Sequence, residues 1–98
     1  MPQGPIQTTN VNLTKTRLNI TAATVVKLGA GRVAKVSVVV AGSAAGSVND
    51  CATTGAAATS NELAPLPNAL GTIDLQFAYS TGLVIVPGTG QTLAVSYQ

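Results

Sequence analysis

Short β-type runs constrain the fold of this chain more than any other feature. In the run TIDLQFAY, which starts at Thr72, every second side chain is large and apolar. A period of two is that of a strand with one buried face, and no stretch keeps the period of an amphipathic helix. Gly and Pro interrupt these runs about every ten residues. The sequence therefore predicts an all-β fold of about seven or eight strands, a small β-sandwich or jelly-roll-like domain.

The predicted domain covers residues 17–98, and residues 1–16 are predicted to form an extended N-terminal arm. The arm contains two Pro and four Thr and has no periodic apolar face. Within the domain, side chains that share the inward phase of the alternation are expected to form the core. They are Leu18, Ile20, Val36, Val38, Val40, Ile73, Leu75, Phe77, Leu93 and Val95. If Phe77 is buried, Phe77→Ala should cost about 3–5 kcal/mol.

The sequence contains a repeated pattern, in LGAGRVAKVSVVV from Leu28 and in VPGTGQTLAVSYQ from Val86. Each copy has Gly-x-Gly, four further residues and Val-Ser, after an apolar run. A phosphate-binding loop needs a helix after the glycines, so that backbone amides point at the phosphate. In both copies a β-type run follows instead. The pattern therefore predicts two equivalent hairpin tips, where glycine supplies a positive φ.

The composition indicates a thin core. Apolar residues make up 46% of the 98 residues, but the chain has one Phe, two Tyr and no Trp. Aromatic side chains normally bury the largest area per residue, so an Ala- and Val-rich core gives a small domain little stability. We therefore expect the protein to form a homo-oligomer, a dimer or a trimer, or to dock on a larger body.

Charged residues are few, and they are distributed unevenly along the chain. They make up 8% of the sequence; all five Lys and Arg lie in the first 35 residues, and all three acids follow. Strands from the two halves can interleave and remove this asymmetry, or it can produce complementary faces between subunits. A net charge of +2 is too small to indicate a nucleic-acid partner.

The segment VNDC holds the best candidates for chemistry. The chain has no His, so the usual base that activates a cysteine nucleophile is missing, and Cys51 is expected to be a small apolar core residue. Asp50 has no evident second carboxylate with which to form a catalytic pair. Asn49 and Asp50 are expected to cap a turn. We predict that the protein is not an enzyme and holds no cofactor or metal.

Other classes of partner also lack a sequence signature. No apolar stretch reaches the roughly 18 residues that a membrane-spanning helix needs. The start, MPQGPIQTTN, has neither the basic nor the apolar region of a secretory signal, so we expect synthesis in the cytoplasm. The three aromatic side chains fall on inward faces, where they cannot stack on bases or sugars, although Tyr97 is close enough to the terminus to be exposed. We therefore expect no membrane and no nucleic-acid partner.

The order of motifs over residues 20–98 resembles a group of small β-rich virion proteins of tailed bacteriophages. The resemblance rests on ITAATVVKLGAGRVAKVSVVV, on the Asp-bearing strand at Asp50 and on the closing STGLVIVPGTGQTLAVSYQ. Cys51 departs from the Asn that follows the Asp in that group. The arm lies outside the matched region.

This resemblance implies a capsid decoration or cement protein on the exterior of the virion, made in the host cytoplasm. Its implied partner is the major capsid protein, whose lattice it would bind and stabilise. A phage tail or head-fibre module that contacts the host surface is the alternative. The candidate contacts with the capsid lie in the arm and at the start of the domain: Ile6, Val11, Leu13, Lys15 and Arg17.

Overall fold

The protein is an all-β sandwich of eight strands, as the sequence predicts. The computed structural model describes residues 14–98. The strands are β1 (Lys15–Ile20), β2 (Thr24–Leu28), β3 (Gly31–Val40), β4 (Gly46–Asp50), β5 (Glu62–Leu66), β6 (Gly71–Tyr79), β7 (Gly82–Val86) and β8 (Thr92–Tyr97). Two short 3-10 turns, Thr54–Ala56 and Thr59–Asn61, lie between β4 and β5.

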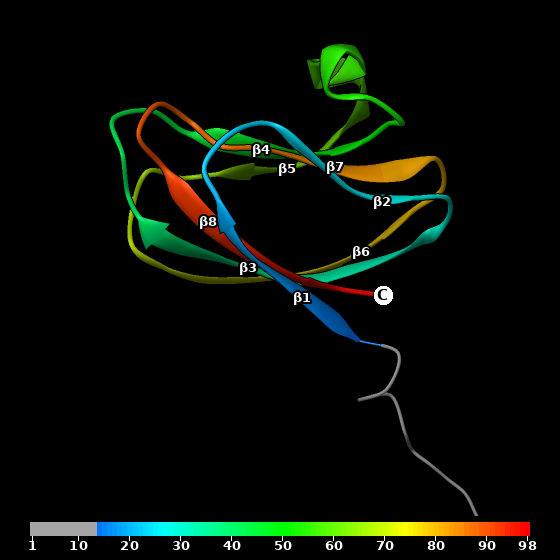
Figure 1. Ribbon diagram of the computed structural model, residues 1–98, viewed down its shortest axis with the longest axis horizontal. Helices are drawn as coiled ribbons and strands as arrows, with labels where there is room; N and C mark the ends of the chain where they lie inside the picture. Colours follow the sequence, from blue (N-terminus) through cyan, green and yellow to red (C-terminus); the bar gives the residue numbers. More distant parts are fainter. Residues whose placement is uncertain (1–13) are drawn as a thin grey trace, which may run out of the picture.

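The strands form two four-stranded antiparallel sheets (Figure 1). One sheet has the order β1-β8-β3-β6 and is called sheet A below. The other has the order β2-β7-β4-β5 and is called sheet B. The first strand pairs with the last, the second with the seventh, the third with the sixth and the fourth with the fifth. This order is that of a jelly roll, in which one long folded hairpin curls into two packed sheets.

The register follows the same folded hairpin from one end of the domain to the other. From both ends of the sequence toward its middle, the paired residues are Lys15 with Tyr97, Leu28 with Gly82, Gly31 with Tyr79, Val38 with Gly71 and Gly46 with Leu66. The turn of this hairpin is the segment 51–61. β1 begins at Lys15, so Lys15 and Thr16 belong to the sheet and not to the predicted arm.

The two Gly-x-Gly segments are not hairpin tips, contrary to the sequence prediction. The first joins β2 in sheet B to β3 in sheet A, and the second joins β7 in sheet B to β8 in sheet A. Because β2 pairs with β7 and β3 pairs with β8, both antiparallel, the two connections lie at opposite ends of the sandwich (Figure 1). The repeat therefore marks two equivalent crossings between the sheets.

Each crossing uses one glycine for its φ angle and the other for space. Gly29 has φ +86° in open surroundings, while a Cβ at Gly31 would collide with the carbonyl of Gln98 and the hydroxyl of Tyr79. In the second copy the order is reversed. A Cβ at Gly88 would collide with the Ala44 carbonyl, and Gly90 has φ +75°. An L-residue rarely adopts such positive φ angles.

The core between the sheets consists mainly of aliphatic side chains, with Tyr79 as its buried aromatic residue. The prediction is confirmed for Ile20, Val36, Val38, Leu93 and Val95, which are buried, and Ile73 and Leu75 are half-buried against them. The other buried members are Val33, Val48, Leu66, Tyr79, Leu83 and Ile85.

Three predicted core residues are wrong: Leu18, Val40 and Phe77 are 68%, 48% and 43% exposed. Between Arg17 and Ile20, β1 has two residues, Leu18 and Asn19, where β8 has only Ala94, and this bulge leaves Leu18 exposed. A similar bulge at Val39 turns Val40 outward. An extra residue in one strand shifts the alternation by one. Phe77 does pair with buried Val33, but it lies on β6, an edge strand, which leaves its ring partly uncovered.

The outer faces of the two sheets differ. Val84 of β7 points away from the core cluster and is still fully buried, since the 3-10 turn Thr54–Ala56 packs against β7. This agrees with the continuous apolar run GLVIV, which is typical of a strand covered on both sides. In Figure 1 the segment 51–61 rises above sheet B, whereas no part of residues 14–98 covers the outer face of sheet A.

Candidate functional site

The carboxylate of Asp50, the best sequence candidate for chemistry, holds the turn between β6 and β7. Oδ1 accepts hydrogen bonds from the backbone N–H groups of Thr81 (2.8 Å) and Gly82 (3.2 Å). Oδ2 accepts from the backbone N–H of Ser80 (3.0 Å) and from its hydroxyl (3.2 Å). All these donors belong to one turn. Asp50 is therefore a turn-capping residue, as the sequence predicts.

These hydrogen bonds also determine the protonation of Asp50. Burial alone raises the pKa of this carboxyl, but the donors from Ser80, Thr81 and Gly82 stabilise its charged form and bring the pKa below its ordinary value. A base with a lowered pKa binds protons weakly near neutral pH. The group is thus suited to fixing a turn and poorly suited to acid–base catalysis.

Asn49 and Cys51 are also used within the fold. Buried Asn49 donates through Nδ2 to the Ala58 carbonyl (3.0 Å) and to Oδ1 of Asn61 (2.9 Å). Its own Oδ1 accepts from the Ser47 hydroxyl (2.7 Å). The Cys51 thiol is buried, as predicted, and donates to the Thr53 carbonyl (3.4 Å). Asn49 and Cys51 thus fasten the segment 51–61 over sheet B.

We expect Asp50→Ala to lower the free energy of unfolding by about 2 kcal/mol near neutral pH, because three backbone donors lose a charged acceptor. Since the folded pKa of Asp50 is lowered, its contribution is present above the unfolded pKa and is lost as the pH falls through the folded pKa. Urea unfolding at neutral and acidic pH measures both effects.

Asp74→Ala is the matched control for this experiment. Asp74 is exposed, and its carboxylate accepts a hydrogen bond from the Gln76 side chain (2.9 Å). Its removal should change stability by less than about 0.5 kcal/mol. An Asp50→Ala protein as stable as the Asp74→Ala protein, or equally destabilised at every pH, would contradict the assigned role of Asp50.

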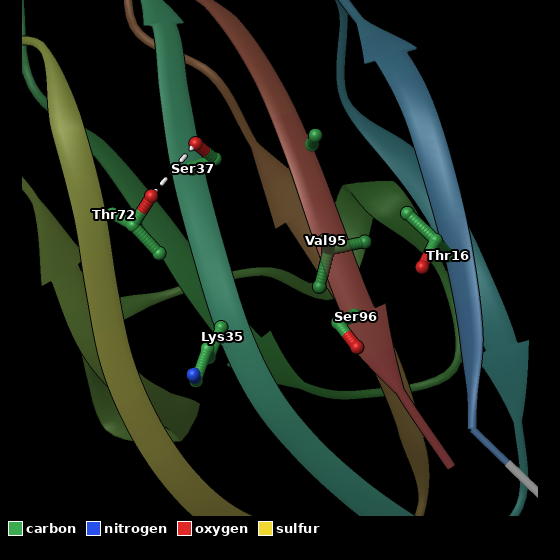
Figure 2. A pocket seen from close by; sticks show the side chains of 7 residues that line it. Thr16, Lys35, Ser37, Thr72, Val95 and Ser96 are labelled. Carbon is green, nitrogen blue, oxygen red and sulfur yellow. Dashed lines mark hydrogen bonds between the residues drawn. The ribbon is translucent and has the colours of Figure 1, made fainter. Parts of the chain in front are cut away.

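A shallow groove of about 170 Å³ crosses the outer face of sheet A (Figure 2). Residues from all four strands line it: Thr16, Ser37, Thr72, Ala94, Val95 and Ser96, with Lys35 at its side. Of these, Val95 has its side chain in the core between the sheets. The Ser37 and Thr72 hydroxyls lie 3.1 Å apart and form a hydrogen bond across β3 and β6. The groove offers methyl groups, hydroxyls and one ammonium group. Among the described residues that line the groove there is no carboxylate and no thiol.

The predicted contact residues fall into two groups. Lys15 and Arg17 are exposed on β1, an edge strand of sheet A. Ile6, Val11 and Leu13 lie outside the residues that the structure describes. The groove was not predicted, although one Thr or Ser in each of four separate runs is its signal. Only the strand order brings those four runs side by side.

The aromatic side chains follow the sequence prediction in part. Tyr79 is buried, and its hydroxyl donates to the Gln98 carbonyl (2.6 Å). Burial, and to a smaller extent the charge of Tyr97, raise the pKa of Tyr79 above its ordinary value. Tyr97 is half-buried, and Phe77 is exposed. Since the tyrosine rings are covered wholly or in part, they do not form an exposed stacking platform.

One basic and one acidic residue from the two halves of the chain lie opposite each other on neighbouring strands. In sheet A, Lys35 of β3 stands opposite Asp74 of β6.

In residues 14–98, His, Cys, Asp and Glu form no group of three or more that could hold a metal ion. The helical turns in this part of the chain lack the length and apolar character of a membrane-spanning helix. The chain as a whole matches no known family, no curated protein and no solved structure at a significant level.

Proposed function

We propose that this protein is a structural protein of a tailed-bacteriophage virion, which decorates the exterior of the capsid and binds the lattice of the major capsid protein. The sequence resemblance over residues 20–98 supports this class of protein. The geometry supports a binding role, because Asn49, Asp50 and Cys51 are all engaged in fastening loops. This leaves the open faces of the sandwich for partners. Jelly rolls occur in viral capsid proteins, but also in lectins and cupins, so the fold alone does not decide the function.

In this proposal the protein has no catalytic activity and needs no cofactor, nucleic acid or membrane. Lys15 and Arg17 meet acidic side chains of the capsid, and Ile6, Val11 and Leu13 supply apolar contacts. Supporting this, both cationic side chains are exposed on an edge strand, where a partner can approach both the side chains and the free backbone groups.

The alternative is a tail or head-fibre module that contacts the host surface. The exposed apolar side chains and the shallow groove fit either kind of partner. The two roles differ in copy number, because a decoration protein occupies positions over the whole capsid lattice and a fibre occupies few positions.

Band intensities of purified virions on a denaturing gel test this proposal. We expect a copy number comparable to that of the major capsid protein. A few copies per particle would favour the fibre, and absence of the protein from the particle would contradict both roles. In a rebinding assay with undecorated heads, the double variant K15E and R17E should be retained less than the wild type, whereas Arg32→Glu, an exposed charge on β3, should be retained normally.

A further inference from the structure

One end of the sandwich carries no charged side chain. It is formed by the connections 41–45, 67–70 and 87–91, which gather at the left of Figure 1, and by 21–23. The connection 21–23 lies at the same end as 87–91, because Ile20 pairs with Leu93 and Thr24 pairs with Ile85, on either side of 87–91. None of the four connections contains Lys, Arg, Asp or Glu. This region is called the uncharged end below.

The charged residues of the chain all lie toward the opposite end or in the middle of the strands. Lys27 and Arg32 flank the first crossing, and Asp50 and Glu62 flank the segment 51–61. The remaining four are Lys15, Arg17, Lys35 and Asp74. The residues that give the chain its formal net charge of +2 therefore lie away from the uncharged end.

Large aliphatic side chains are exposed at the uncharged end. Leu70 is 71% exposed and Val39 is 56% exposed. Gly71, the first residue of β6, pairs with Val38 of β3. Leu70 directly precedes this pair in the connection 67–70, and Val39 directly follows it on β3, so both lie at the same end of the β3–β6 pair. Val40 follows at the end of β3 and is also exposed. Clustered exposed aliphatic residues without charges are typical of surfaces that a protein partner covers.

Hydrogen bonds hold three of these connections in one arrangement. Fully buried Gln91 donates through Nε2 to the Pro67 carbonyl (3.0 Å) and accepts through Oε1 from the Gly88 N–H (2.9 Å). The Ser43 N–H donates to the Thr89 carbonyl (2.8 Å). A surface that is already ordered loses little conformational entropy when it binds. The uncharged end is thus preorganised for binding.

We infer that the uncharged end docks against the same end of a second copy of this chain, related by a two-fold axis. Two uncharged ends can meet without removing water from any charge. The charged parts, which carry net positive charge, are then kept apart, whereas contact through the charged ends would bring like charges together. An isologous contact also uses Leu70 and Val39 twice. This inference does not depend on the proposed capsid role.

Analytical ultracentrifugation of the purified protein over a range of concentrations tests the inference. We expect a monomer–dimer equilibrium whose Kd is raised at least about 30-fold by Leu70→Asp, since each dimer then buries two uncompensated carboxylates. Leu28→Asp is the matched control, because Leu28 is 64% exposed but lies beside the first crossing, at the other end. It should leave the Kd unchanged. Circular dichroism verifies that both variants are folded.

The outcomes separate this contact from the proposed function. A monomer at every concentration would overturn the inference, as would a trimer or a dimer that Leu70→Asp does not weaken. A monomeric wild type whose rebinding to undecorated heads is abolished by Leu70→Asp would also overturn it, and would assign the uncharged end to the capsid. A dimer that depends on Leu70 supports the inference even if the protein is absent from virions.

Discussion

Gly88→Ala should lower the free energy of unfolding by about 3 kcal/mol, one of the two largest effects expected from a single substitution in this protein. A Cβ at position 88 would overlap the carbonyl oxygen of Ala44. Both atoms belong to, or are attached directly to, backbone in the connections 41–45 and 87–91. Relief of the collision therefore requires those connections to separate. Chemical denaturation followed by circular dichroism measures the loss.

Two other glycines provide the controls. Gly55→Ala should be nearly neutral, because a Cβ there meets nothing within 4 Å. Gly90→Ala should cost about 1–2 kcal/mol, because its φ is +75° while its nearest contact is an ordinary 3.6 Å. The predicted order is therefore Gly88, then Gly90, then Gly55. Equal effects at Gly88 and Gly55 would show that the connections tolerate separation.

The strands could be predicted from the sequence because alternation is a local property. Runs such as 72–79 and the continuous run at 83–86 correspond to β6 and β7. The role of the Gly-x-Gly segments could not be predicted in the same way. A tight turn within one sheet and a crossing between two sheets need similar residues, and only the long-range pairing of β2 with β7 and β3 with β8 distinguishes them.

Bulges explain why the predicted core was partly wrong. Non-glycine residues with positive φ occur at Asn19 and Gln76, both next to shifts of register in the edge strands of sheet A. Asn adopts this conformation more readily than most residues, but Gln gives no such signal. Bulges also make an edge strand a poor template for unwanted pairing. Alternation extended through Asn19 thus places Leu18 on the wrong face.

The candidate site shows the same division. The role of Asp50 as a turn cap was predicted because Asp favours such positions, and its partners at 80–82 became known only from the fold. The groove on sheet A and the uncharged end were not predicted. Both combine residues from distant segments of the chain. That four connections lack charged residues gains meaning only when the strand order places them at one end of the sandwich.

Leu83→Ala should destabilise the protein by about 4 kcal/mol, more than any other substitution considered for this chain. Leu83 lies on β7, an inner strand of sheet B, and its side chain is fully buried in the core. Truncation removes apolar contacts and leaves a cavity that the neighbouring strands cannot close, because they are fixed by hydrogen bonds on both sides of β7. Urea unfolding of the isolated protein measures the effect.

Phe77→Ala is the comparison for Leu83→Ala, because the structure and the residue type predict different losses of stability for it. Phe has a larger side chain than Leu. Side-chain size and the alternation pattern alone therefore predict that Phe77→Ala loses more stability than Leu83→Ala. Since Phe77 is 43% exposed on edge strand β6, we expect a loss of only about 1 kcal/mol, because much of its ring is already in water. If Phe77→Ala instead destabilises the isolated protein as much as Leu83→Ala, the ring is buried in solution. In that case either β6 packs closer to sheet B in solution, or a second copy covers this edge of the sandwich, and the contact would then not be confined to the uncharged end.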